Sequence, residues 1–144
     1  MVSLDQLAAK ADCGDLLYRF ASALDRTAHE EAADMFADDG VAVRPDGAEL
    51  SGQAVREMLL SRPTDIMTVH VLSNLVVTST GTDTAEGLAY VVAYRAPRPA
   101  GQALPLPLPA APHGVGDWRV QFRRTAAGWR LSRWQATAIL AASQ

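Results

Sequence analysis

The sequence is poor in the residues that build disulfides and metal centres. Its 144 residues include a single cysteine, Cys13, so an intramolecular disulfide and a zinc site made of several cysteines are excluded. The three histidines, His29, His70 and His113, lack the close spacing of paired metal ligands. The chain also has no glycine-rich phosphate loop and no Gly-x-Ser-x-Gly nucleophile motif. We therefore expect no metal and no cofactor.

Charge and hydropathy exclude two further classes of partner. The formal net charge is −3, whereas proteins that bind nucleic acid through its phosphates carry a basic stripe. The apolar stretch near Leu72 to Val77 is interrupted by Ser73 and Asn74 and is too short to cross a bilayer. Residues 1–20 lack the basic start and continuous apolar core of a signal peptide. We expect a cytoplasmic protein that binds neither nucleic acid nor membranes.

What the chain does have is enough apolar residues for a core. A chain of this length buries roughly two thirds of its unfolded surface, and two domains would each fall below the usual size. With 49% hydrophobic residues, the chain can fill a core and still line an internal pocket. We expect a single domain over residues 1–144.

Residues 1–61 have the patterns of helices. Ser3 and Gln6 fit a capping box, and apolar residues at helical spacing predict a first helix that continues to Asp25 and bends or breaks at Gly14. A Thr27–Glu30 capping box predicts a second helix, which runs through Phe36 and stops at 38–40. A strand is predicted from Val41 to Arg44. A third helix is predicted from Gln53 to about Ser61, with Ser51 as its cap.

The second half has the patterns of β-strands. Four strands are predicted, at Ile66 to Thr78, Thr84 to Tyr94, Val115 to Arg124 and Trp129 to Leu140. The segment 97–114 is rich in proline and is therefore a loop; its place at the end of two strands would let it act as a lid. The order predicts an α+β fold, with three N-terminal helices packed on a curved, mostly antiparallel sheet that closes a cone around a pocket.

Two residues break the apolar pattern around them. Asp25 extends the apolar stripe that reaches Leu24, near a helix C-terminus, where the helix dipole disfavours a carboxylate. His70 lies in the most apolar strand, where alternation puts it on one face with Thr68 and Leu72. If that face looks toward the helices, Asp25 can hold one ring nitrogen of His70. The other nitrogen is then a base near neutral pH.

Each of these residues also has a purely structural interpretation. Asp25 lies at a helix end, where its carboxylate can reach water or cap a neighbour. His70 can be a core histidine whose ring is satisfied by backbone groups. The residue pattern alone leaves both interpretations open.

Several segments resemble one family when taken in order and spacing. They are Asp15-Leu-Leu-Tyr-Arg-Phe-Ala-Ser-Ala-Leu-Asp25-Arg, Ala33-Asp-Met-Phe36-Ala-Asp-Asp39, Gly52, His70-Val-Leu-Ser-Asn74 and Gly128-Trp-Arg-Leu. Together they resemble SnoaL-like proteins of the nuclear transport factor 2-like superfamily, near the polyketide cyclases and scytalone dehydratases. The resemblance covers nearly the whole chain except the proline-rich loop.

The resemblance implies a conical cavity and, in the dehydratase-type members, an Asp–His dyad that works without a cofactor. Asp25 and His70 match the two positions of that dyad. The implied role of His70 is to remove a proton from an activated carbon, while Asp25 orients the ring and stabilises the imidazolium.

Two positions depart from the pattern of the family. Phe20 stands where relatives often carry a tyrosine or lysine that helps a leaving group or an oxyanion. The last strand often supplies an arginine to the cavity. Here Arg133 and Trp134 alternate in that strand, and the sequence does not say which one points inward.

Aromatic and apolar residues provide candidates for the pocket wall. Trp118 and Phe122 share one strand face and suit a flat hydrophobic ligand, although they can equally be ordinary core residues. The full candidate set for the pocket is Tyr18, Phe20, Phe36, Leu72, Tyr90, Trp118, Phe122 and Trp134.

These observations favour a lyase or isomerase of dehydratase or cyclase type. Its expected substrate is a small hydrophobic molecule, a class that includes polycyclic compounds. The alternative is a non-catalytic module for small-molecule binding or assembly. Val69, Val71, Leu75 and Val77, on the side of the strand opposite His70, predict a second apolar sheet face. We therefore expect a homo-oligomer, with a dimer favoured over a trimer.

Overall fold

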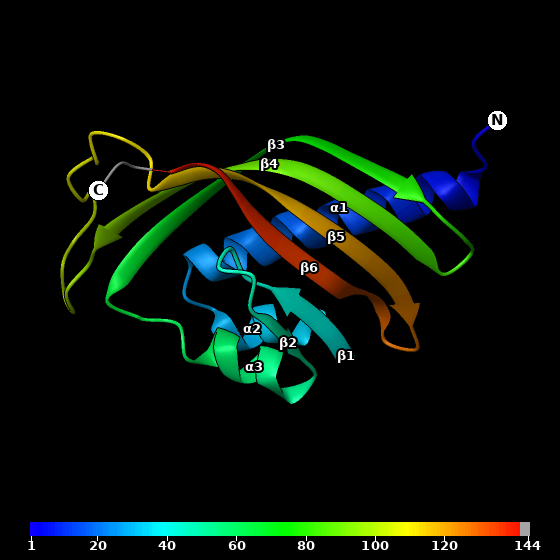
Figure 1. Ribbon diagram of the computed structural model, residues 1–144, viewed down its shortest axis with the longest axis horizontal. Helices are drawn as coiled ribbons and strands as arrows, with labels where there is room; N and C mark the ends of the chain where they lie inside the picture. Colours follow the sequence, from blue (N-terminus) through cyan, green and yellow to red (C-terminus); the bar gives the residue numbers. More distant parts are fainter. Residues whose placement is uncertain (142–144) are drawn as a thin grey trace.

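A long helix, α1 (Leu4–Asp25), crosses one face of a curved sheet in the computed structural model (Figure 1). The structure describes residues 1–141. The remaining elements are α2 (His29–Asp34), β1 (Phe36–Val43), β2 (Glu49–Ser51), α3 (Gln53–Leu60), β3 (Ile66–Ser79), β4 (Thr84–Pro97), β5 (Gly114–Thr125) and β6 (Gly128–Ala141). The α+β class predicted from the sequence is confirmed.

The first helix begins as predicted and continues through Gly14 without a break. The Ser3 side chain accepts a hydrogen bond from the Gln6 backbone, and the Gln6 side chain accepts one in return. α1 then continues through Gly14, which is buried against Leu75 of β3. Packing of this small residue against the sheet offsets the helix cost of glycine. The helix ends at Asp25.

Residues 27–51 differ most from the sequence prediction. Thr27 has a φ of 56° and does not cap α2, which begins at His29 without a side-chain cap. α2 ends at Asp34, and Phe36 starts β1 instead of ending a helix. β1 pairs in parallel with β6, a contact distant in sequence that overrides the local helical pattern. Ser51 belongs to β2, and Gly52 is the residue before α3.

The described part of the sheet has six strands in the order β2-β1-β6-β5-β4-β3. β1 and β6 are parallel, and the other neighbours are antiparallel. The prediction that the sheet closes into a cone is wrong. β2 and β3 are edge strands, so the sheet is open and does not close on itself. In Figure 1 the long strands β3 to β6 arch across α1.

A bulge in β3 decides which side chains face α1. Register shifts between Ser73 and Val76, and Asn74 has a φ of 55°. His70 faces α1, and after the bulge Leu75 and Val77 pack against the core on that same face. The prediction that Leu75 and Val77 lie on the opposite face is therefore wrong, because the extra residue restarts the alternation.

The outer face of the sheet carries exposed apolar side chains, and the homodimer stays a prediction. These side chains are Val69, Val71, Val76, Leu88 and Tyr90. β3 and β4 are neighbouring strands, so the side chains form one patch of the kind that marks interfaces. We expect wild-type protein to sediment as a dimer at micromolar concentration.

The Val71→Glu variant tests this interface. A charge in the centre of a buried apolar patch costs free energy, so sedimentation equilibrium should show a weaker dimer. The matched control is Leu108→Glu, which changes an exposed leucine of the proline-rich loop. Wild-type protein that sediments as a monomer would refute the dimer.

Candidate functional site

The structure brings Asp25 and His70 into direct contact. Asp25 Oδ1 lies 2.5 Å from His70 Nδ1, and Asp25 Oδ2 accepts a hydrogen bond of 2.8 Å from the His70 backbone N–H. Both side chains are largely buried, with 19% and 13% of their surfaces exposed. The end of α1 supplies the carboxylate, and β3 supplies the imidazole.

Thr68 adds a third hydrogen bond to the same carboxylate. Its Oγ1 donates to Asp25 Oδ1 over 3.0 Å. The alternation of the strand predicts that Thr68 lies on the same face as His70, but no role was predicted for it. Its position two residues before His70 is the sequence signal that could have indicated the contact. These three hydrogen-bond donors thus offset the unfavourable interaction between the Asp25 carboxylate and the dipole at the C-terminus of the helix.

The contact fixes which nitrogen of His70 is available for chemistry. A carboxylate only accepts hydrogen bonds, so Nδ1 carries the proton and Nε2 of the neutral ring has the free lone pair. The ring lies beside Trp118, with 5.5 Å between ring centroids. The arrangement is that of a base whose orientation is held by a carboxylate.

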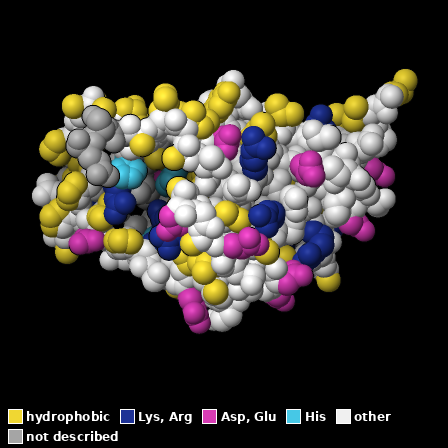
Figure 2. All heavy atoms as spheres, viewed as in Figure 1, with side chains coloured by type: hydrophobic (Ala, Val, Ile, Leu, Met, Phe, Trp, Pro, Cys, Tyr) yellow, Lys and Arg dark blue, Asp and Glu magenta, His cyan; other side chains and the backbone are white. Residues whose placement is uncertain are grey.

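His70 forms part of the wall of an open hollow of about 330 Å³, hereafter the His70 hollow. Its wall includes Leu24, Arg62, His113, Trp118 and Trp134, together with backbone near the ends of β4, β5 and β6. Figure 2 shows histidine side chains in a hollow beside the basic and apolar groups that surround them. The volume suits a small ligand.

Trp134, and not Arg133, is the residue of the last strand that lies in the wall of the hollow. Trp134 is buried against Phe20, with ring centroids 5.5 Å apart, and lies in the wall of the His70 hollow. Arg133 forms an ion pair with Glu49 of β2. The last strand therefore supplies an indole to the hollow, and its arginine is held elsewhere.

The other predicted pocket residues fall into two groups. Phe20, Phe36, Leu72 and Phe122 belong to the packed core or lie against it, and none of them lines the His70 hollow. Tyr18 and Tyr90 are 49% and 50% exposed, so their placement in the pocket is wrong. Tyr90 lies between the buried residues Ala89 and Val91, and alternation turns it to the outer face.

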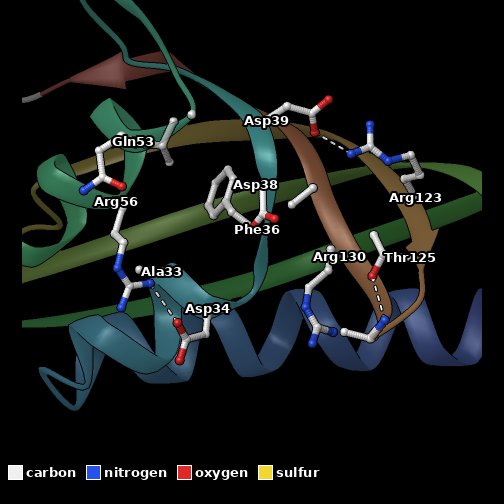
Figure 3. A pocket seen from close by; sticks show the side chains of 14 residues that line it. Ala33, Asp34, Phe36, Asp38, Asp39, Gln53, Arg56, Arg123, Thr125 and Arg130 are labelled. Carbon is white, nitrogen blue, oxygen red and sulfur yellow. Dashed lines mark hydrogen bonds and ion pairs between the residues drawn. The ribbon is translucent and has the colours of Figure 1, made fainter.

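A second cleft, of about 680 Å³, lies among β1, α3 and the β5–β6 turn (Figure 3). Two of its arginines contact aspartates of the same cleft: Arg56 contacts Asp34 over 2.8 Å, and Arg123 contacts Asp39. Sequence reasoning missed this cleft because these partners lie 22 and 84 positions apart. It contains no histidine or cysteine, so the His70 hollow is the stronger candidate for proton chemistry.

Among residues 1–141, no three His, Cys, Asp or Glu side chains lie close enough together to hold a metal ion. In the same residues, no helix combines the length and the apolar character needed to cross a membrane.

Comparison with known proteins identifies the family. The model of the SnoaL-like domain matches residues 5–135. The chain belongs to the SnoaL-like family. No curated protein matches the sequence.

Solved structures share the fold of this SnoaL-like protein. A proposed dehydratase of the NTF2-like family from Streptomyces avermitilis has a TM-score of 0.75 and 22% identity, covering 90% of this chain and 95% of its own. A proposed scytalone dehydratase from Novosphingobium aromaticivorans has 0.72 and 17%, covering 89% and 82%. An NTF2-like protein with a cystatin-like fold from the same species has 0.67 and 26%, covering 96% and 92%.

The hydrogen bond from Thr68 predicts a measurable loss of stability. Thr68→Val removes one donor from a largely buried carboxylate, so the free energy of unfolding should fall by about 1–2 kcal/mol. Thr78→Val is the matched control, because Thr78 is exposed in the same strand. Urea denaturation of the SnoaL-like protein measures both. Equal losses in the two variants would contradict the role of the Thr68–Asp25 bond.

Proposed function

We propose that this SnoaL-like protein is a cofactor-independent acid–base enzyme, a lyase or isomerase of dehydratase or cyclase type. Its substrate is a small hydrophobic molecule, a class that includes polycyclic compounds. The observation that carries the proposal is the contact between Asp25 and His70 at the wall of the His70 hollow.

In the proposed reaction, Nε2 of His70 removes a proton from a carbon that a neighbouring group makes acidic. The C–H bond breaks, its electron pair stays on the substrate, and the ring becomes an imidazolium. Asp25 stabilises that charge through Nδ1. The imidazolium then returns the proton to a departing hydroxyl group, which completes a dehydration, or to another carbon, which completes an isomerisation.

The surroundings of the pair support this role. Trp118 lies beside the ring of His70, and Trp134 lies in the same wall. These indoles give a flat hydrophobic ligand an apolar surface beside the base. Similar structures include proposed dehydratases of the same fold, which is consistent with the reaction class.

A second candidate is a non-catalytic binding or assembly module. Two residues support this alternative. Phe20 is fully buried in the core, and Trp134 puts an indole where relatives often carry a polar group. Binding without turnover by the His70 hollow would favour this alternative.

The role of His70 predicts its effect on proton exchange. A panel of cyclic ketones, with and without a β-hydroxyl group, is incubated with the protein in deuterated water, and incorporation of deuterium is measured by mass spectrometry. Because general base catalysis contributes about 10²–10⁴-fold, His70→Ala should lower the exchange rate of an accepted ketone at least about 100-fold. Asp25→Asn should lower it as well, since the ring loses its charged partner.

Tyr90→Phe is the matched control for this experiment. Its side chain lies half exposed on the outer face of the sheet, so the exchange rate should equal that of wild type. Equal rates in wild type and His70→Ala would refute the proposed mechanism.

A further inference from the structure

Arg62 holds a cationic side chain at the wall of the His70 hollow. It lies between α3 and β3, in the segment Ser61-Arg62-Pro63. α3 ends at Leu60, and the Arg62 backbone N–H still donates to the Leu59 carbonyl over 3.3 Å. A residue before proline is pushed out of helical conformation, so the end of the helix fixes where this arginine stands.

The Arg62 guanidinium has no carboxylate partner in the described chain. Its Nε is buried without a hydrogen-bond acceptor among residues 1–141, and no ion pair of these residues includes it. Arg56 and Arg123, by contrast, each contact an aspartate. Burial of the Nε–H without an acceptor costs free energy, and an anion that reaches the guanidinium recovers part of that cost.

The charges around Arg62 keep this side chain available to a ligand. Burial lowers the pKa of Arg62, the Asp25 carboxylate raises it, and the Arg95 charge lowers it. The guanidinium nevertheless stays protonated near neutral pH. Asp25 is already engaged by Thr68 and His70, so its carboxylate does not neutralise Arg62 by direct pairing.

The other polar groups near the hollow fit the role less well. His113 is exposed, so water competes with a ligand for its ring nitrogens. Arg133 is held by Glu49. Trp134 has an indole N–H that is buried without an acceptor; it is a neutral donor and cannot match a guanidinium as a partner for an anion.

We propose that Arg62 binds an oxygen of the ligand that carries or develops negative charge, and that the substrate is a hydrophobic carbonyl compound. The proposal rests on the proposed function of His70. When Nε2 of His70 takes the proton from the carbon next to the carbonyl, the C–H electron pair moves into the C–C bond. The carbonyl π electrons then move to oxygen, which becomes an enolate that Arg62 stabilises. Arg62 thereby supplies the positive charge that Arg133 does not bring to the hollow.

4-Nitrophenol is the probe, because its phenolate resembles an enolate oxygen on a flat ring and its absorbance reports ionisation. On wild-type protein, the pKa of bound 4-nitrophenol should lie below that of the free phenol. Arg62→Gln should weaken phenolate binding about tenfold or more, the size of a charge-assisted hydrogen bond, and Arg62→Lys should restore part of it. Binding of nitrobenzene, which has no ionisable oxygen, should be unchanged in both variants.

Arg133→Gln is the matched control, since it removes the same charge from the side chain that pairs with Glu49. Phenolate binding by this variant should equal that of wild type. The His70→Gln variant separates the two proposals: if Arg62 holds the phenolate, the preference for phenolate over nitrobenzene persists in His70→Gln, even where ketone exchange is absent. A preference that disappears in His70→Gln and persists in Arg62→Gln overturns the role of Arg62.

A wild-type protein that does not lower the pKa of bound 4-nitrophenol also overturns the role of Arg62, whether or not the variants fold. So does an Arg62→Gln variant in which nitrobenzene binding falls, relative to wild type, as far as phenolate binding falls, because that result means that Arg62 supports the shape of the hollow and not the charge of the ligand. Neither outcome bears on proton removal by His70, which the ketone exchange measures separately.

Discussion

The Asp25 carboxylate joins the end of α1 to β3, and the geometry of the site depends on this junction. It accepts hydrogen bonds from the Thr68 hydroxyl, the His70 backbone and the His70 ring. A carboxylate at a helix C-terminus opposes the helix dipole. The donors from the sheet offset that penalty only while the helix and strand keep their present positions, so the same contacts fix the fold and the tautomer of the imidazole.

Packing around this junction determines what a ligand would meet. Phe20 lies edge-on to Trp134, and Trp118 lies beside both Trp134 and His70. These rings leave His70 at the wall of an apolar hollow, with Arg62 as a cation in the same wall. A base with an oriented tautomer and an unpaired guanidinium in the wall of the same hollow form an arrangement suited to moving a proton and holding the charge that results.

Residues close in sequence were predicted well, and residues joined by distant contacts were not. The Ser3 cap and the extents of β3 to β6 follow from local patterns, and the structure agrees within a few residues. Phe36 was predicted to be helical, but parallel pairing of β1 with β6 made it a strand residue. Tyr18 and Tyr90 were assigned to the pocket by type, whereas the direction of each side chain follows from the packing of α1 and the register of β4.

The sequence alone shows that an acid at a helix end and a histidine in an apolar strand are out of place, because periodicity and polarity are local properties. It also determined the family through the order and spacing of short segments. The folded structure was needed to show that Thr68 completes the carboxylate's hydrogen bonds and that Trp134, rather than Arg133, lies in the wall of the hollow. It alone placed Arg62 in that wall, because the approach of α3 to the sheet depends on contacts between segments far apart in the chain.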